Sequence, residues 1–558
     1  MRLFPLLVLS AAACSGGQSD VGGSPGGSSD AGGGVSFGGA QDIGEFRSIL
    51  DRGEIPGPKT LDANGFFNEH FNEPPDIQCG GILCLTPGLS VFRDWMTDRH
   101  QAALQISINT HIDPTQYERL PMKLVVVVDH SGSMESDDRL EKVKGGLHTL
   151  IDNLKPEDRL AIVSFDDVVT YDAAFGATRP QLHAAVSALV PRGGTNIYDG
   201  LQAGFAMLGE TPSTTNQNRI IFLSDGLATV GNTSQDAIIE MATGRISTGI
   251  GLTTIGVGND FDVELMRGLA ERGAGNFYYV EDATAATEVF TQELDYFLSP
   301  IALDLRIEAT AAVGWDFQTV VGSTLWQAQP RTGSMQVPAV FLASRTTQGG
   351  GEPGRRGGGS MIFIHLNPTA HEAGKVADLV LSYRVPGQTD RVSHTVSLDY
   401  QRDPLEQLEQ PYLSNPEMAE RYAMYNAFLG FQAASQYAGF DWNCASAAIA
   451  ATRRHAQAWL VGHEADLDLA ADIVLMDKFL ANLRTKGATS EDATILDSCA
   501  SGSGPGGGWG SGDGGTWGYD EPSQDRGGML YCSAGPADAT WLLVLGALGL
   551  VIRRRRRR

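Results

Sequence analysis

The stretch Leu124-Val-Val-Val-Val-Asp129-His-Ser131-Gly-Ser133 decides the fold of a large part of this chain. Its continuous apolar run, rich in valine, is typical of a strand that is buried on both faces of a parallel sheet. Polar residues follow at once where the strand ends. Because ligands bind outside the carboxyl ends of the strands in an open α/β sheet, we expect Asp129, Ser131 and Ser133 to stand at a binding edge.

Around this stretch, short apolar runs alternate with helical periodicities. The other predicted strands are residues 160–165, 220–223, 252–257 and 277–280, with a hairpin partner at 168–175. The predicted helices are residues 139–154, 197–208, 235–246, 263–271 and 287–297. Such an alternation gives a parallel sheet with helices on both faces, so we expect a doubly wound, Rossmann-like α/β domain over residues 122–298.

Two later stretches supply further oxygen ligands at comparable places. Thr195 lies in a loop that enters a helix, and Asp225 ends a predicted strand. The candidate metal ligands are therefore two carboxylates and three hydroxyls, from Asp129, Ser131, Ser133, Thr195 and Asp225. This all-oxygen set suits Mg²⁺, Ca²⁺ or Mn²⁺ rather than zinc or copper.

The order of these residues resembles the metal-ion-dependent adhesion site of von Willebrand factor A domains, whose pattern is DxSxS, then a threonine, then an aspartate at a strand end. The resemblance implies that Ser131 and Ser133 coordinate the ion directly and that Asp129 and Asp225 act mainly through water. Thr195 would switch between direct and water-mediated contact. The sixth position would be left for an Asp or Glu carboxylate of a protein ligand.

The same region offers two other interpretations. Asp129, His130 and Ser131 could suggest a hydrolytic triad, but a triad converges from separate segments, so we interpret His130 as an exposed neighbour of the site. Asp137 and Asp138 could recapitulate the adjacent regulatory metal site of integrin-type domains. A helix capped by Ser136, with acidic residues in its first turn, explains them adequately. No nucleophile–base pair, phosphate loop or redox motif is evident, so no catalytic residue and no enzyme activity are expected.

The remaining chain divides into further segments. Residues 43–121 form an N-terminal segment and residues 401–499 a helical domain, in which Met418, Tyr422, Tyr425 and Leu429 have the spacing of a buried stripe. Between residues 299 and 400 apolar side chains alternate with polar ones, as in Leu303, Leu305 and Ile307, which predicts an antiparallel β-sandwich interrupted by a glycine-rich loop at 349–359.

The N-terminal segment and the order of the parts resemble the YfbK-like group of bacterial von Willebrand A proteins. The resemblance rests on Phe46-Arg-Ser-Ile-Leu-Asp-Arg-Gly-Glu-Ile-Pro56 and on Gly65-Phe-Phe-Asn-Glu-His-Phe71. It covers about residues 43–486, and it implies the architecture more than the function. The insertion between Cys79 and Cys84 and the glycine loop depart from the group.

Four of the six cysteines lie outside the terminal segments that hold Cys14 and Cys532. An even number in an exported protein suggests disulfides, and four cysteines allow three connectivities. Proximity in the sequence favours Cys79 with Cys84 and Cys444 with Cys499.

The N-terminus resembles an export signal over residues 1–13, with Arg2, an apolar run and Ala11-Ala-Ala13 before Cys14. Cleavage there would leave Cys14 as a lipid acceptor in the manner of a bacterial lipoprotein, although Ala11 departs from the usual lipobox. A glycine- and serine-rich linker is expected over residues 14–42.

A second glycine-rich linker is expected at residues 500–531, before a terminal segment at 532–558. There Cys532, a short apolar run and six arginines resemble the MYXO-CTERM sorting signal of myxobacteria. That resemblance implies retention at the inner membrane, cleavage near Cys532 and delivery to the cell surface. A simple tail anchor is the alternative, although the apolar run is shorter than the roughly twenty residues that span a bilayer.

The net charge of -25 argues against a nucleic-acid partner, which needs a basic surface, and is compatible with attracting divalent cations. The function expected is therefore that of a cell-envelope or surface-displayed protein that binds a protein ligand through a divalent ion. The alternative is an assembly factor of an envelope complex, in which the metal site is organising.

Overall fold

The computed structural model describes residues 33–70, 79–112, 120–209, 216–246, 250–258, 261–273, 275–280, 289–290, 300–343 and 359–501. The expected export signal, Cys14, most of both glycine-rich linkers, nearly all of the glycine loop and the C-terminal sorting segment lie outside the described residues. No helix within the described ranges is long and apolar enough to cross a bilayer.

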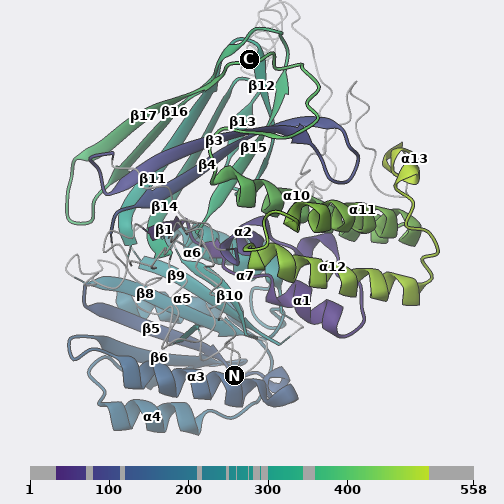
Figure 1. The fold of residues 1–558 in the computed structure, drawn as a ribbon. Helices are drawn as coiled ribbons and strands as arrows, with labels where there is room; N and C mark the ends of the chain where they lie inside the picture. The colour runs from purple at the N-terminus through teal and green to yellow at the C-terminus, as the bar shows by residue number, and fades with distance from the viewer. Residues whose placement is uncertain are drawn as a thin grey trace, which may run out of the picture. The chain divides into compact units, whose positions relative to one another are not determined.

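The first of two sheets is the predicted α/β sheet (Figure 1). Its order is β2-β10-β9-β8-β5-β6-β7, and every neighbouring pair is parallel except β6 with β7. The strands are β2 (Gly39–Ala40), β5 (Met122–Asp129), β6 (Arg159–Phe165), β7 (Val169–Ala173), β8 (Gln217–Ser224), β9 (Ile250–Val257) and β10 (Asn276–Val280). The predicted doubly wound fold is confirmed.

Both faces of this sheet are covered by helices. Leu124, Val126 and Val128 of β5 share a core with α3 (Arg139–Asn153) and α4 (Arg179–Ala188). Val125 and Val127 point the other way, into a core with helices α5 (Ile197–Leu208), α6 (Gln235–Ile246) and α7 (Val263–Arg272). The continuous valine run therefore forms a strand buried on both faces, as its composition predicts.

The second sheet is antiparallel throughout and combines two distant parts of the chain. Its strands are β1 (Gly33–Ser36), β3 (Leu83–Arg93), β4 (His100–Thr110), β11 (Pro300–Ala311), β12 (Trp315–Val321), β13 (Gln327–Gln329), β14 (Thr332–Ala343), β15 (Met361–Pro368), β16 (Gly374–Arg384), β17 (Arg391–Tyr400) and β18 (Tyr412–Leu413). Strands β3 and β17 are in contact, and the folded-over sheet encloses one core as a sandwich does. Strands from the expected N-terminal segment and from the expected sandwich thus share one sheet.

The last ten residues of the expected linker, 33–42, are structured instead. Strand β1 pairs with β4 and β14 of the second sheet, and β2 then pairs with β10 of the first. Gly38 and Gly39, with φ of 83° and 81°, form the bend between them. A Cβ on Gly38 would lie 2.5 Å from the carbonyl oxygen of Gly275. Glycine is therefore needed here for a close backbone approach rather than for flexibility.

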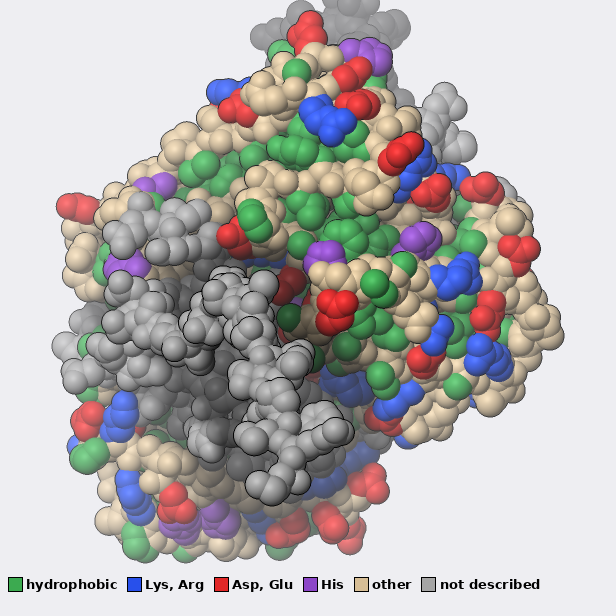
Figure 2. Space-filling view, in the orientation of Figure 1, with side chains coloured by type: hydrophobic (Ala, Val, Ile, Leu, Met, Phe, Trp, Pro, Cys, Tyr) green, Lys and Arg blue, Asp and Glu red, His purple; other side chains and the backbone are tan. Residues whose placement is uncertain are grey.

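The C-terminal region is helical, as predicted, with α10 (Met418–Ala438), α11 (Trp442–Leu460), α12 (Leu467–Lys486), η4 (Ala493–Ile495) and α13 (Leu496–Ser501). The N-terminal helices α1 (Gly44–Asp51) and α2 (Ala63–Asn68), with η1 (Pro58–Thr60) between them, pack into the same core through Phe46, Phe66 and Phe67. His70 then pairs with Asp472 of α12 at 3.0 Å. Charged side chains of both signs are interspersed over the outer surface of this region (Figure 2).

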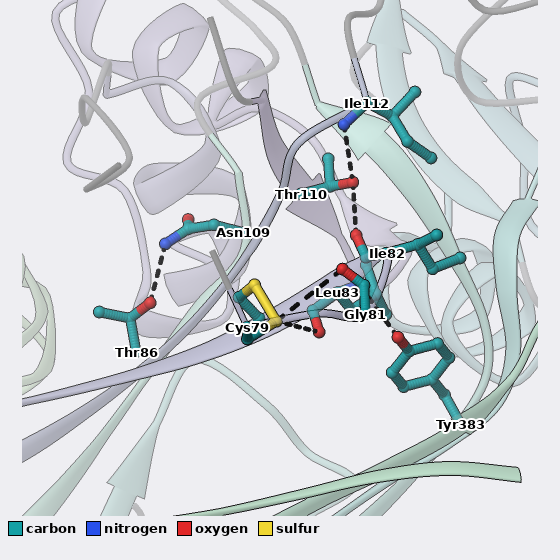
Figure 3. Close-up of a disulfide and its surroundings, with 10 residues drawn as sticks. Cys79, Gly81, Ile82, Leu83, Thr86, Asn109, Thr110, Ile112 and Tyr383 are labelled. Carbon is teal, nitrogen blue, oxygen red and sulfur yellow. Dashed lines mark hydrogen bonds between the residues drawn. A yellow bond between two sulfur atoms is a disulfide. The ribbon is translucent and has the colours of Figure 1, made fainter. Parts of the chain in front are cut away.

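Two disulfides form, and they are the pairs that proximity favours, Cys79–Cys84 and Cys444–Cys499. The first closes a short loop before β3 (Figure 3). That loop is held by a hydrogen bond from the Leu83 N–H to the Tyr383 hydroxyl at 3.1 Å and by one from the Thr110 hydroxyl to the Ile82 carbonyl at 2.6 Å. The second disulfide joins α11 to α13.

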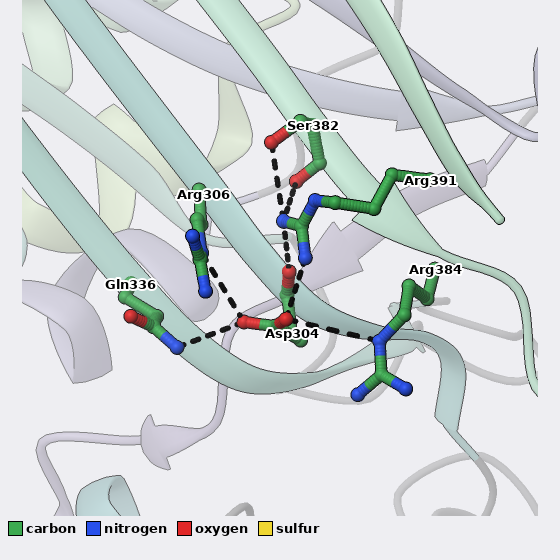
Figure 4. A network of polar contacts seen from close by, with 6 residues as sticks. All are labelled: Asp304, Arg306, Gln336, Ser382, Arg384 and Arg391. Atoms are coloured by element: carbon green, nitrogen blue, oxygen red, sulfur yellow. Dashed lines mark hydrogen bonds and ion pairs between the residues drawn. The ribbon is translucent and has the colours of Figure 1, made fainter. Parts of the chain in front are cut away.

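A β-bulge in β11 is stabilised by charge (Figure 4). Asp304 has a φ of 48°, an unfavourable conformation for a residue with a side chain. Its carboxylate accepts a hydrogen bond from Gln336 at 2.8 Å and faces the guanidinium groups of Arg306, Arg384 and Arg391. These contacts hold the backbone of Asp304 in its strained conformation.

Candidate functional site

The candidate site lies where β5 and β8 end side by side at the carboxyl edge of the first sheet. Strand β5 ends at Asp129, and η3 (Gly132–Asp138) carries the chain to α3. The Asp129 carboxylate is fully buried and accepts hydrogen bonds from the Ser131 N–H at 2.8 Å and from the Ser224 hydroxyl at 2.6 Å. These two bonds fix the loop after β5 and join it to β8.

The two serine hydroxyls and the second carboxylate form a continuous chain of oxygen atoms. The Ser131 and Ser133 hydroxyls are 3.1 Å apart, and the Ser133 hydroxyl donates to Asp225 at 2.7 Å. Ser133 is exposed, whereas Asp225 is fully buried just beyond the end of β8. Residues separated by 92 positions are therefore in direct contact at this edge.

Thr195 approaches the same place from the loop before α5. Its N–H donates to the Thr229 hydroxyl at 2.9 Å, and its carbonyl accepts from the N–H groups of Thr229 and Val230, so its backbone is fixed. A Cβ on Gly226 would lie 3.7 Å from both the Ser133 and the Thr195 hydroxyl oxygens. The structure thus brings all five candidate residues to one edge, with glycine leaving space between two of the hydroxyls.

The chemistry of this donor set fits a hard divalent ion, since every candidate ligand atom is oxygen. Within the described ranges, no three side chains of histidine, cysteine, aspartate or glutamate gather as a metal-binding group. An ion at this edge would therefore depend on hydroxyl ligands together with the two carboxylates. The hydroxyls are neutral, so only the two carboxylates would offset the charge of such an ion.

Burial raises the pKa of the Asp129 carboxyl to about 6. The hydrogen bonds from Ser224 and Ser131 favour the ionised form and limit the rise, while the nearby Asp225 adds to it. The role of Ser224 was not predicted, although it stands directly before Asp225 at the strand end. The carboxyl is ionised at neutral pH, when a cation would be most strongly attracted.

Arg139 is a second residue that the sequence did not reveal as part of the site. It is the first residue of α3, its side chain is only 5% exposed, and it donates to the fully buried Asp225 carboxylate at 2.9 Å. Gly258 makes room for it, because a Cβ there would lie 2.4 Å from the Arg139 Nε. The structure therefore contains a cation directly behind the candidate metal ligands.

The expected exposure of His130 is wrong. This side chain is buried, and its Nδ1 lies 2.9 Å from the carbonyl oxygen of Val190. The Arg192 N–H donates to the His130 carbonyl, and the Gly132 N–H donates to the Gly193 carbonyl. The hydrogen bonds of His130 thus help to hold the Ser131 loop against the Thr195 loop.

The expected cap at Ser136 is also wrong. Helix α3 begins at Arg139, and Asp138 is its N-cap residue without a side-chain capping bond. Asp137 and Asp138 both have left-handed backbone conformations, with φ of 50° and 55°, and their side chains are exposed. They lie at the rim of the site, where the two strained residues turn the chain into α3.

This geometry accompanies a family match in the sequence. The family model of the von Willebrand factor type A domain matches residues 124–227. The chain contains a von Willebrand factor type A domain. The match runs from β5 through the end of β8 and includes all five candidate residues.

Among curated proteins, the chain is 30% identical over 202 residues to "Uncharacterized protein YfbK" of Escherichia coli, which covers 36% of this chain and 35% of that protein. It is 29% identical over 180 residues to the inter-alpha-trypsin inhibitor heavy chain H2 of Mesocricetus auratus, covering 29% and 19% of the two chains. The chain thus spans about a third or less of the length of these relatives.

Among solved structures, the chain is similar to "von Willebrand factor type A from Catenulispora acidiphila", with 14% identity and a TM-score of 0.45 over 70% of this chain and 89% of that one. It is also similar to the ArnB paralog VWA2 from Sulfolobus acidocaldarius, with a TM-score of 0.37 and 14% identity over 73% and 98% of the two chains.

Proposed function

We propose that the A domain binds a protein ligand through a divalent ion, Mg²⁺ or else Mn²⁺ or Ca²⁺, held by Asp129, Ser131, Ser133, Thr195 and Asp225. The ligand supplies an Asp or Glu carboxylate to the open coordination position. The observation that carries this proposal is the chain of oxygen atoms from Ser131 through Ser133 to Asp225, with Thr195 facing the same gap at Gly226.

The charges around the site support a binding step that requires the ion. Glu135, Asp137, Asp138 and Asp167 are all exposed on the surrounding loops. Without a cation, this rim and the two site carboxylates repel an acidic ligand. A bound divalent ion reverses the local sign and offers the ligand carboxylate a charge-assisted bond.

Apolar side chains beside the site support a protein as the ligand. Val168, Val190 and Leu227 are 64%, 58% and 55% exposed. The N–H of Val168 donates to Asp166, the carbonyl of Val190 faces His130, and Leu227 follows the site glycine, so all three lie on loops that build the site. The ligand is therefore an acidic side chain with apolar neighbours, in keeping with the composition of protein interfaces.

We extend the proposal to an exported protein of the cell envelope, outer membrane or cell surface, anchored through a lipid at Cys14, through the C-terminal segment, or through both. The two disulfides support an oxidising compartment, because such bonds are rare in the reducing cytosol. The proposed role is binding, and it assigns no catalytic residue.

Calorimetry with Mg²⁺, Mn²⁺ and Ca²⁺ tests the metal step on the wild type, Ser133→Ala and Ser136→Ala. Ser136 is the matched control, since it is an exposed serine in the same loop. We expect Ser136→Ala to bind the ion as the wild type does and Ser133→Ala to bind at least tenfold more weakly. Absence of Mg²⁺, Mn²⁺ and Ca²⁺ uptake by the wild type refutes the proposal.

Capture of partners from envelope extracts, with and without EDTA, tests the ligand step with the wild type and Asp129→Ala. Partners lost under both treatments support recruitment through the ion. Partners retained under both support the alternative, an assembly factor in which the metal site is organising.

A further inference from the structure

A second group of metal-ligating side chains lies on the outer surface of the A domain, between α3 and α4. The Nδ1 atoms of His148, on α3, and His183, on α4, are 2.8 Å apart. Their ring centroids are 5.0 Å apart, so each Nδ1 lies on the side of its ring that faces the other ring. Histidine side chains are visible on the surface over these helices in Figure 2.

The outer nitrogen of each ring has its own partner. His183 Nε2 lies 3.1 Å from the Asp152 carboxylate, which can only accept when ionised, so this nitrogen carries a proton. The Ser187 hydroxyl donates to the His183 backbone carbonyl at 2.8 Å, which uses its only proton. It can therefore only accept from His148 Nε2, 3.5 Å away.

This arrangement directs both Nδ1 lone pairs into the space between the rings. A neutral imidazole with its proton on Nε2 has an unprotonated Nδ1. Two such lone pairs at 2.8 Å repel each other unless a cation lies between or beside them.

We propose that His148 and His183 bind a borderline divalent transition-metal ion, of the class of Zn²⁺, Ni²⁺ or Cu²⁺, through their Nδ1 atoms. Imidazole nitrogen suits these ions, whereas Mg²⁺ and Ca²⁺ prefer oxygen. Two zinc–nitrogen bonds of about 2.0–2.1 Å meeting at the tetrahedral angle hold the nitrogens roughly 3.3 Å apart. The two nitrogens, 2.8 Å apart here, would need to separate by about half an ångström.

The surroundings favour this ion. A metal-bound histidine commonly donates its other N–H to a carboxylate, as His183 does to Asp152. Lys144, one turn before His148, is paired with Glu141 at 2.7 Å, so its charge is offset. Since no third His, Cys, Asp or Glu ligand joins the pair within the described ranges, water or a donor from a partner surface completes the coordination.

This site is separate from the oxygen site. His148 is nine residues along α3 from Arg139, about 13 Å at the helical rise of 1.5 Å per residue. The two sites also differ in ligand type, so they bind different ions. The proposal does not rest on the proposed function of the oxygen site.

Zinc titration of the full chain, purified without a histidine tag and in excess Mg²⁺, tests the proposal by calorimetry and native mass spectrometry. We expect one equivalent of Zn²⁺ to bind the wild type and none to bind His183→Gln or His148→Gln. The matched control is His371→Gln, because His371 is an exposed histidine that also pairs with an aspartate, Asp403. This control is expected to bind zinc as the wild type does.

Asp152→Asn tests whether Asp152 orients His183, because this substitution keeps both histidine ligands. If Asp152 orients His183 for the metal, its replacement weakens zinc binding by about 10–100-fold. Equal zinc uptake by the wild type and His183→Gln overturns the proposal, and so does a wild type that binds no zinc. A wild type that takes up zinc but binds no Mg²⁺ would count against the oxygen site alone.

Discussion

Replacing Arg139 by methionine is expected to destabilise the metal-free protein, because the substitution leaves a buried carboxylate without its counter-charge. The Arg139 and Asp225 side chains are 5% and 0% exposed, and their charged atoms are 2.9 Å apart. Solvent screening is therefore slight. Removing one partner of such a buried pair costs about 3–5 kcal/mol. Coulomb's law at an effective dielectric constant of roughly 20 gives a similar attraction, about 4 kcal/mol for charges some 4 Å apart.

Thermal unfolding in EDTA measures this loss. For a domain of this size, each kcal/mol shifts the midpoint by about 2–4 °C, so a fall of roughly 10 °C is expected for the transition of the A domain. Arg192→Met is the matched control. Its pair with Asp166 is also an arginine–aspartate contact beside the site, but the Arg192 side chain is 55% exposed. That substitution should cost about 0–1 kcal/mol.

A double substitution separates lost charge from lost packing. Arg139→Met combined with Asp225→Asn removes both charges, so it should recover much of the stability that Arg139→Met loses. The single variant should also gain more stability from Mn²⁺ than the wild type does, because the ion replaces the missing positive charge. The reasoning is refuted if Arg139→Met and Arg192→Met unfold at the same temperature in EDTA.

Three further outcomes are expected. Burial lowers the pKa of His70, but the Asp472 carboxylate outweighs this effect and holds the pKa at about 9. Because this pKa is raised from 6.5, the His70–Asp472 pair stabilises the fold fully below pH 6.5. About 3 kcal/mol of that stabilisation is lost as the pH rises through 9. Denaturant titrations across that range should show the loss in the wild type and not in Asp472→Asn, and a parallel decline in both would contradict it. Leu227→Ser should weaken capture of a protein ligand while leaving Mn²⁺ affinity unchanged in calorimetry, and a change in Mn²⁺ affinity would show that Leu227 acts on the metal loops. Replacing Cys444 and Cys499 by serine should cost about 4 kcal/mol in chemical denaturation, against about 2 kcal/mol for replacing Cys79 and Cys84. The reason is that the Cys444–Cys499 bond closes a longer loop than the Cys79–Cys84 bond. Equal losses would count against the loop-entropy account.

The parts of the fold that the sequence predicted are those governed by local periodicity. The valine run of β5 alternates between two helical layers, and both layers are needed to bury it. The helix α4 was missed, although Pro180 in its first turn and a capping box between Thr178 and Gln181 signal its start. Hydrophobic periodicity in α4 is weaker than these capping signals, so a search for amphipathic stretches passes over it.

Strands β1 and β2 were missed for a different reason. A glycine-rich composition usually indicates a linker, because it buries little apolar surface. Here the pairing is made by backbone groups, with Val35 and Phe37 as the buried anchors. Their partners are strands β14 and β10, far away in the chain, and no local pattern specifies such long-range pairs.

Within the candidate site, the sequence predicted the residues that a motif specifies and missed those that only the fold brings close. Ser133 and Asp225 belong to a recognised order of residues. Arg139 contacts Asp225 across 86 positions, and an arginine at the start of an amphipathic helix gives no sign of such a contact. His148 and His183 lie 35 residues apart on two helices, which conceals their pairing in the same way.

If the site binds a divalent ion as proposed, its charges give Arg139 a role beyond stability. At neutral pH, Asp129 and Asp225 contribute two negative charges and Arg139 one positive charge, so the metal-free site has a net charge of one negative. A divalent ion changes this to one positive, which attracts a ligand carboxylate. Without Arg139 the same ion would bind more tightly but would only neutralise the site. Under the proposed function, the buried arginine would therefore lower the affinity for the ion. It would also raise the attraction of the ion-loaded site for an acidic ligand, so one residue would have opposite effects on the two binding steps.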